Sequence, residues 1–348
     1  MAPVLATIAP DAALEPIADA LAATPEEDRA MRGTLRDAFA KALAATPPGH
    51  LAPILGDRQR SVAARLELMR AASGRLNEAP AESTANLAEL LTDSPPMRAR
   101  YLALGPLAEL AHGGDRAAAG RIEESVVHDA DWPVRSRAAE LASGLPDASA
   151  VLVVAAHDPE PRVREAALGA LAASSSTSSD AVHAGVDAVE HEGWWFVKTQ
   201  AVALLASAPA SSEVDDALGG AIHDPSINVR GGAIVALARR RAVRWRSTIR
   251  ERLDDTGEDI EVRGAAARAL GALCDSDSAD RLSELARALG STATDSDAQQ
   301  LGFAAVVGLA ALHPPDLQKR LAALLASDAP PYARAAAQRA LAARGMCK

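Results

Sequence analysis

The strongest concentration of residues able to bind a charged ligand is a run of arginines around Trp245. The stretch 229–252 holds eight arginines and one glutamate, a net charge of +7 in a chain whose formal net charge is −10. Guanidinium groups beside an aromatic ring can hold phosphates or an acidic protein surface. They could equally pair with the acids that follow at 254–259, on a solvated turn. The candidate partner-binding residues of this arginine cluster are Arg239, Arg240, Arg241, Arg244, Trp245 and Arg246.

The densest aromatic group lies at 194–196, in a chain that is only 3% aromatic. Tryptophan and arginine are enriched at interface hot spots, so Trp194 and Trp195 are also candidate partner-binding residues. Trp132 and Trp195 each stand two residues before a recurring valine, at a position that is apolar in several repeats. This register also predicts that both rings pack against the helix that follows.

The sequence carries no recognisable catalytic or metal-binding pattern. Nucleophile elbow, phosphate-binding loop, dinucleotide-binding glycine fingerprint and zinc-binding HExxH helix are all missing. Four histidines recur just before an acid, but helices stacked about 10 Å apart would hold them in a row that cannot converge on one ion. We therefore expect a non-catalytic protein with no metal and no cofactor. The histidines are His128, His157, His191 and His223.

A repeated element must position these residues. The phrase Asp-Pro-Glu-Pro-Arg-Val-Arg-Glu-Ala-Ala-Leu at 158–168 has a counterpart at 224–234. Alignment on the valine gives ten repeats, with steps of 29 to 39 residues that suit helical hairpins. The residues at this valine position are Met31, Val62, Ala99, Val134, Val163, Val197, Val229, Val262, Leu301 and Ala333.

Three positions follow the valine with a helical period. Four residues on, alanine occurs in eight of ten repeats, and eight residues on, leucine occurs in seven, so one helix face is apolar. The next residue, the ladder position, is basic in eight repeats, although Ala63 occupies it after Val62. An acid six residues earlier could cap its own helix and pair with the basic residue of a neighbouring repeat. The predicted structural ladder comprises Asp129, Arg135, Asp158, Arg164, Asp224, Arg230, Arg263, Asp328 and Arg334.

The phrase Asp-Pro-x-x-x-Val-Arg-x-x-Ala resembles HEAT repeats, in the variant named for phycobilisome lyases. The resemblance is strong over 129–273 and weaker before Met97. It implies an all-α solenoid of about ten helical hairpins forming a right-handed superhelix, with second helices lining the concave side. It does not imply lyase activity, because the motif marks a scaffold. We predict one array over 1–348, degenerate over 1–110 and strong over 111–348, with the serine run at 174–179 as a linker inside it.

Composition restricts the expected cellular location and the expected class of partner. The excess of acidic residues (pI about 5.3) disfavours non-specific nucleic-acid binding. Apolar stretches fall short of the ~20 residues of a membrane span, and no basic segment precedes the apolar N-terminus. Cys274 and Cys347 permit no disulfide framework and indicate a reducing compartment. We therefore expect a cytoplasmic location, and the arginine-rich, lysine-poor composition is typical of GC-rich bacterial coding.

The leading hypothesis is a scaffold whose curved helical surface binds another protein across Trp194, Trp195 and the arginine cluster. Two alternatives follow from the resemblance alone: a nucleic-acid-binding protein like the HEAT-like alkylpurine DNA glycosylases, or a HEAT subunit of a bilin-lyase-like enzyme. The mixed, weakly charged character of the expected exposed second-helix positions favours a protein partner. Those positions are Arg137, Glu140, Glu165, Thr199, Gln200, Val235, Arg268 and Val307.

Overall fold

The protein is built from α-helices in hairpins. The computed structural model describes residues 2–92, 95–174, 178–290 and 295–347, and these residues contain helices and turns but no strand. The chain divides into two compact units, 1–176 and 177–348. The serine run predicted as a linker inside one array falls at this division, and residues 175–177 of it lie outside the described residues.

Each unit is a succession of short helices. Unit 1 holds α1 (Ala2–Ile8), α2 (Pro10–Ala23), α3 (Arg29–Ala45), α4 (Leu51–Leu55), α5 (Val62–Ala71), α6 (Pro80–Leu90), α7 (Met97–His112), α8 (Arg116–His128), α9 (Trp132–Leu141), α10 (Ser149–Ala155) and α11 (Pro161–Ala173). Unit 2 holds α12 (Ser179–His191), α13 (Trp195–Leu205), α14 (Ser212–Ala221), α15 (Ile227–Arg239), α16 (Arg246–Asp254), α17 (Ile260–Ala272), α18 (Ala279–Ala286), α19 (Ser296–Leu312), α20 (Leu317–Arg320), α21 (Ala322–Leu325) and α22 (Pro331–Ala342).

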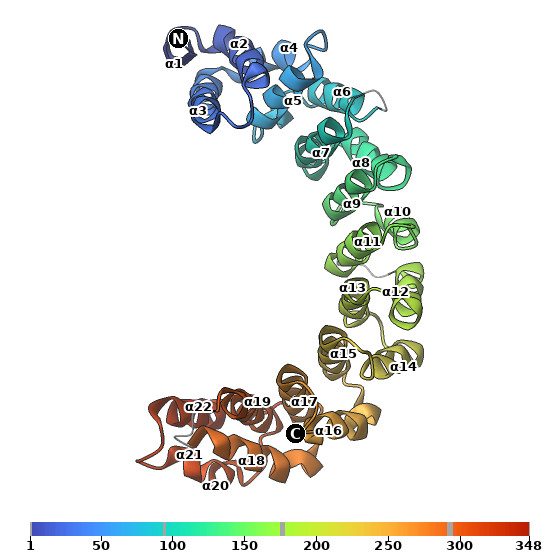
Figure 1. Cartoon of the computed structure of the whole chain (residues 1–348), viewed down its shortest axis with the longest axis vertical. Helices are drawn as coiled ribbons and strands as arrows, with labels where there is room; N and C mark the ends of the chain where they lie inside the picture. Colours follow the sequence, from blue (N-terminus) through green and yellow to red (C-terminus); the bar gives the residue numbers. More distant parts are fainter. Residues whose placement is uncertain (1, 93–94, 175–177, 291–294, 348) are drawn as a thin grey trace. The chain divides into compact units, whose positions relative to one another are not determined.

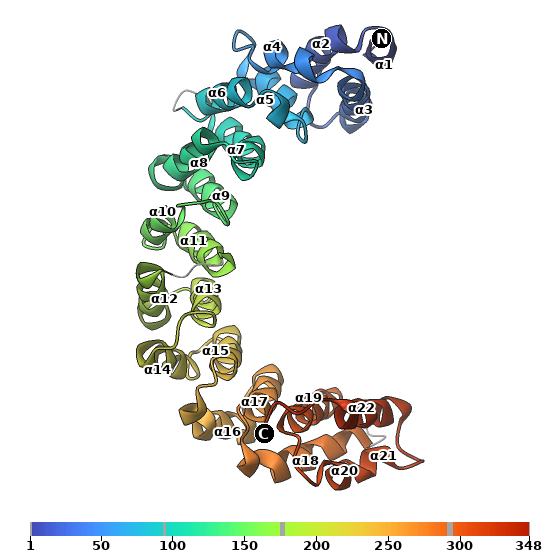
Figure 2. The ribbon, with the colours of Figure 1, turned by 180° about the vertical axis from the view of Figure 1, so that it is seen from behind.

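Within each unit the first and second helices of the hairpins form separate layers. In unit 1, α6, α8 and α10 lie on one side and α7, α9 and α11 on the other, which Figures 1 and 2 show from opposite directions. In unit 2, α12, α14 and α16 form one layer, and α13, α15 and α17 form the second. The predicted all-α solenoid of hairpins is confirmed.

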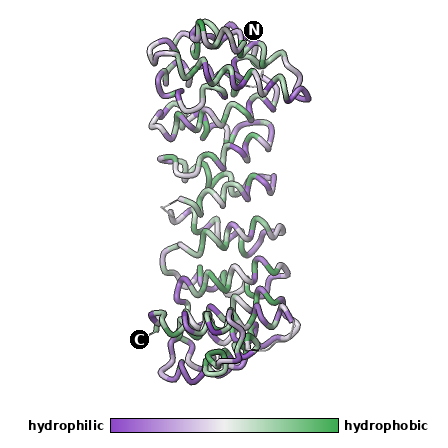
Figure 3. Tube along the Cα trace, turned by 90° about the vertical axis from the view of Figure 1, so that its left-hand side faces the viewer, coloured by the Kyte–Doolittle hydropathy of each residue, from purple (hydrophilic) through white to green (hydrophobic). Residues whose placement is uncertain are grey.

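The core lies between the layers and follows the register of the repeat. Val134, Val197 and Val229 at the valine position are fully buried, as are the alanines four residues later and almost all the leucines eight residues later. Hydrophobic and hydrophilic segments accordingly alternate along the helices (Figure 3). A methyl group at the alanine position lets neighbouring helices approach, and leucine fills the space beyond.

The two cysteines meet at the end of the chain. A disulfide joins Cys274, just after α17, to Cys347, with the Cα atoms 5.5 Å apart. The tail that carries Cys347 is anchored where the Met346 N–H donates to the Ala311 carbonyl at 2.8 Å. The sequence analysis expected a reducing compartment, and the disulfide counts against that expectation because such bonds persist mainly in oxidising surroundings. None of the helices within the described residues is both long and apolar enough to cross a membrane.

Candidate functional site

The ladder acids lie in the turn that precedes each second helix. The Asp158 carboxylate accepts the Glu160 N–H at 2.8 Å, and the Asp224 carboxylate accepts the Ser226 N–H at 2.8 Å. The N-cap residues of α11 and α15 are Glu160 and Ser226, so the prediction that the aspartates are N-caps is wrong. Each aspartate instead closes an Asx turn, a local bond to a backbone N–H two residues on, which sets the chain's entry into the helix.

Arg135 connects two consecutive second helices of unit 1. Its Nη1 donates to the Asp129 carbonyl at 2.9 Å, and its Nε and Nη2 donate to the two Asp158 oxygens at 2.8 and 3.0 Å. The hydrogen bonds to Asp158 raise the pKa of Arg135. Burial pushes the pKa of Asp158 up, but hydrogen bonds from Arg135 and from the Glu160 N–H bring it below its usual value. The pair is therefore ionised near neutral pH and bridges the two repeats.

The ladder continues with variations. Arg100 pairs with Asp129 at 2.8 Å in unit 1. In unit 2, Lys198 pairs with Asp224 at 2.8 Å, and Arg230 pairs with Glu258 at 2.5 Å. The position six residues before Arg263 is Gly257, so Glu258, the next residue, takes the place of the ladder acid there. Three other predicted members donate to backbone carbonyls: Arg164 to those of Asp158 and Pro159, Arg263 to that of Leu253, and Arg334 to that of Ser327. Asp328 is exposed.

Most of the arginine cluster is used inside unit 2. The side chain of Arg240 is only 4% exposed, with Nε 2.6 Å from Asp215 Oδ1 and Nη1 donating to the Ala208 carbonyl at 2.6 Å, just after α13. Arg246 donates to the Leu273 carbonyl at the end of α17. Arg244 pairs with Asp216 at 2.7 Å. Guanidinium groups thus donate to carbonyls at or just after helix C-termini. A positive charge is favourable there because the last carbonyls of a helix have no donor within it and the helix dipole is negative at that end.

Trp245 packs within unit 2. Its ring lies against Gly219 of α14, where an added Cβ would come within 2.0 Å of the ring. Its indole nitrogen is buried without a hydrogen-bond partner among the described residues. The glycine opens a slot that the ring fills, and the partner-binding role of Trp245 stays a prediction. Arg239 and Arg241 remain exposed, and neither has an ion pair within the part of the chain that the structure describes.

The aromatic group, Trp194, Trp195 and Phe196, stands at the start of α13. Trp194 is 53% exposed and Trp195 is 50% exposed. Their rings lie 5.6 and 5.9 Å from that of Phe196, centroid to centroid. Beside them is a hollow of about 710 Å³, lined by Trp195, Ile227 and the Lys198–Asp224 pair. The group is an apolar surface next to a hollow whose walls are mostly apolar, with the Lys198–Asp224 pair among them.

Packing was the wrong prediction for the two aligned tryptophans. Trp132 is 45% exposed at the first residue of α9, as Trp195 is at the first residue of α13. The valine two residues later is the first side chain of each helix to reach the core. Because each tryptophan is the first residue of its second helix, the rest of the fold covers only about half of the side chain.

Metal binding is not indicated by the histidines. Among the described residues, no group of three or more histidine, cysteine, aspartate or glutamate side chains could hold an ion. His223 lies 2.6 Å from Arg252, and His191 lies 3.1 Å from Asp187.

The comparisons with known proteins agree with this geometry. A family model described as HEAT repeats matches residues 215–291. Residues 215–291 therefore carry HEAT repeats. No curated protein matches the sequence.

Solved structures similar to this HEAT-repeat chain share its fold at low identity. YibA of Escherichia coli has a TM-score of 0.52 at 17% identity, with 76% of this chain and 96% of that chain covered. Kap95p, from a structure with RanGDP, has a TM-score of 0.59 at 12% identity, covering 98% of this chain and 53% of that one. CpcE and CpcF of the phycocyanin lyase from Nostoc sp. PCC7120 give a TM-score of 0.40 at 18% identity, with 74% of this chain and 93% of that chain covered, which supports no inference about lyase activity.

One cavity of the HEAT-repeat chain was not anticipated from the sequence. It lies in unit 1 around α5, with a volume of about 500 Å³. The signal that could have located it is Ala63, where the ladder position lacks a basic residue.

Proposed function

We propose that this HEAT-repeat chain is a non-catalytic scaffold that binds another protein through the aromatic group and the adjoining hollow of unit 2. The observation that carries the proposal is the pair of half-exposed tryptophans beside a hollow of about 710 Å³. Large aromatic rings left in water gain most from burial in an interface, and tryptophans are frequent hot spots. Kap95p, a solenoid of similar fold, was solved with RanGDP, and a protein partner for this chain is in keeping with that.

The second-helix layer of unit 2 extends this surface. Its large apolar side chains that are exposed are Ile227, Val235, Phe303, Val307 and Tyr332. The rings of Phe303 and Tyr332 are 6.0 Å apart. Apolar groups gathered on one layer are typical of protein-binding surfaces. The nucleic-acid alternative loses support, because Arg240 and Arg246 are engaged within the fold.

Only two arginines of the cluster are then proposed to contact the partner. Arg239 and Arg241 are exposed and could meet acidic groups of the partner at the edge of the surface. A charge at an interface edge acts mainly on the association rate and its salt dependence. We therefore place the centre of the interface at the tryptophans and only its edge at these two arginines.

The test compares capture of proteins from the native host by the wild type, Trp194→Ala and Trp132→Ala. Trp132 is the matched control, because it is a half-exposed tryptophan near the start of a second helix, in unit 1. We expect a partner that is retained by the wild type and Trp132→Ala and lost with Trp194→Ala. With that partner purified, Trp194→Ala should raise the dissociation rate about tenfold or more. Equal capture and equal dissociation by all three proteins would contradict the proposal.

A further inference from the structure

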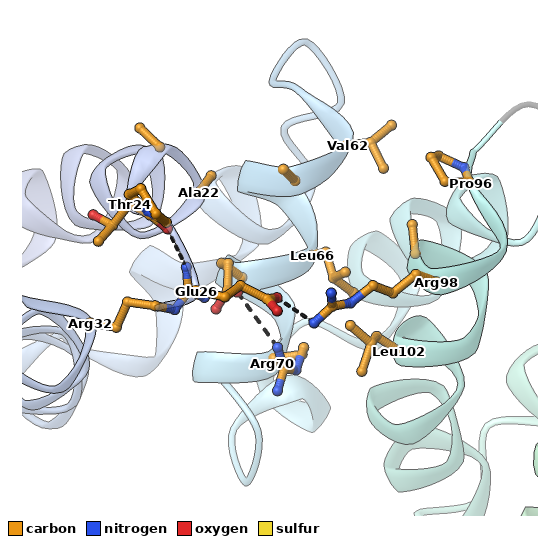
Figure 4. A pocket seen from close by; sticks show the side chains of 15 residues that line it. Ala22, Thr24, Glu26, Arg32, Val62, Leu66, Arg70, Pro96, Arg98 and Leu102 are labelled. Atoms are coloured by element: carbon orange, nitrogen blue, oxygen red, sulfur yellow. Dashed lines mark hydrogen bonds and ion pairs between the residues drawn. The ribbon is translucent and has the colours of Figure 1, made fainter. Parts of the chain in front are cut away.

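The α5 pocket is the cavity of about 500 Å³ on the second-helix layer of unit 1. Its apolar wall comes from Val62 and Leu66 of α5 and from Ala99 and Leu102 of α7. The loop between α2 and α3 forms the opposite rim. Figure 4 shows Glu26 of that loop reaching toward Arg98 of α7, across the middle of the cavity. The volume is within the usual range for sites that bind small ligands or side chains.

The pocket exists because the ladder is interrupted. Ala63 lies in its wall at the position where Arg100 and Arg135 bridge neighbouring repeats. A methyl group cannot span that distance, so the space between α5 and α7 stays open. Arg32, at the ladder position of the preceding repeat, donates to the carbonyls of Leu21 and Thr24, at 2.8 and 2.7 Å, and to Glu67 of α5 at 2.6 Å.

The charges around the pocket favour an anion. Three arginines, Arg32, Arg70 and Arg98, face two glutamates, Glu26 and Glu67. Buried Arg32 is tied to Glu67 at 2.6 Å, so its charge is largely spent within the fold. Arg98 reaches the cavity from the α7 side and pairs with Glu26, and Arg70 reaches it from the α5 side, 3.5 Å from Glu67 (Figure 4). The hydrogen bond from Arg98 lowers the pKa of Glu26, which is ionised near neutral pH.

The Glu26–Arg98 ion pair is easily exchanged. Both side chains are more than 60% exposed, at 62% and 65%. Exposed ion pairs contribute little free energy, so a competing carboxylate can replace Glu26 at small cost. Glu26 belongs to the segment Thr24-Pro25-Glu26, so the chain already places an acidic peptide side chain in this cavity.

We propose that the α5 pocket binds an acidic peptide segment of a partner, whose carboxylate replaces Glu26 at Arg98. An aliphatic side chain next to that carboxylate packs on Val62, Leu66 and Leu102. The peptide is preferred to other ligands because the internal occupant is itself a peptide glutamate beside an apolar wall. This site is separate from the aromatic group of unit 2, so either site can fail while the other stands.

In the experiment, the full chain is titrated with a short capped peptide of alternating leucine and glutamate, and calorimetry measures the binding. The matched peptide carries glutamine in place of glutamate. We expect the glutamate peptide to bind, and the glutamine peptide to bind about tenfold more weakly, because the charge-assisted hydrogen bonds are lost. Equal binding of the two peptides, or no binding of either, would overturn the proposal.

Variants identify the pocket as the site. Glu26→Gln, which removes the internal competitor, should tighten binding of the glutamate peptide about threefold. Arg98→Ala should weaken it about tenfold. Arg137→Ala is the control, since Arg137 forms a similar surface pair with Glu140 on the second helix α9. An unchanged affinity for Arg98→Ala, or a dimer of the chain that excludes the peptide, would show that something else occupies the pocket.

Discussion

Two regions of unit 1 differ at one aligned position. Between α9 and α11, Arg135 reaches from the Asp129 carbonyl to the Asp158 carboxylate and fills the space between repeats. Beside α5, Ala63 occupies the same position and a cavity of about 500 Å³ remains. In unit 1, the basic side chain at this position bridges one pair of neighbouring second helices, and the pair that lacks it borders a cavity.

Unit 2 shows a third kind of junction, made by glycine. Arg263, at the ladder position of α17, donates to the Leu253 carbonyl, and α17 and α19 approach so closely that Gly271 and Gly308 meet backbone to backbone. A Cβ on Gly271 would lie 2.1 Å from the Gly308 carbonyl oxygen. Here the helices need no bridging arginine, because contact between the backbones fills the space directly.

The largest effect is expected at the glycine junction. Gly271→Ala should lower the free energy of unfolding by about 3 kcal/mol, because backbone must move to accommodate the methyl group. Gly231→Ala in α15 is the control, since its methyl would meet nothing nearer than Val262 Cγ2 at 3.9 Å. That change should be neutral or add up to about 1 kcal/mol through helix propensity. Urea unfolding measures both, and similar values for the two variants would contradict the close junction.

A somewhat smaller effect is expected at the bridged junction. Arg135→Ala should cost about 2 kcal/mol, because it leaves Asp158, whose side chain is only 10% exposed, without its partner. Arg137→Ala, which removes a surface pair two residues away, should cost less than about 0.5 kcal/mol. Unfolding midpoints in urea test this, and equal losses would mean that the ladder contributes no more than a surface ion pair.

The smallest expected effect is the pH dependence that the Arg135–Asp158 pair gives to the free energy of unfolding. The pKa of Asp158 is lowered in the folded state, so its contribution to stability is present above the unfolded value of about 3.9. That contribution is lost as the pH falls through the lower folded value. Between about pH 6 and about pH 3, the wild type should lose about 1 kcal/mol more than Arg135→Ala. Matching losses in urea titrations at the two pH values would exclude this linkage.

The sequence was a good guide wherever local pattern determines structure. The valine, alanine and leucine positions predicted the buried face of the second helices, and Val134 and Val197 are indeed fully buried. The pairing of Arg135 with Asp158 could also be predicted, because the helical repeat fixes the spacing of the two residues. The N-cap assignment failed, because an Asx turn and an N-cap use the same residue types two positions apart.

Features that depend on space between elements could not be read from the sequence. Trp245 and Trp194 are both tryptophans beside charged residues, yet one fills a slot over Gly219 and the other stands in solvent. The difference lies in a glycine on another helix, which no local pattern reveals. The α5 pocket likewise depends on three repeats at once, and Ala63 marks it only after the ladder itself is seen.

The most direct test of the contrast between bridged and open junctions is the affinity of Ala63→Arg for the capped leucine–glutamate peptide. Arginine at this position would put a cation and a long side chain into the α5 pocket, as at the bridged junctions. Calorimetry should show binding by the wild type and a loss of about tenfold or more in the variant, with helicity by circular dichroism unchanged. Equal affinity of a folded Ala63→Arg protein would contradict the claim that the missing basic residue creates the site.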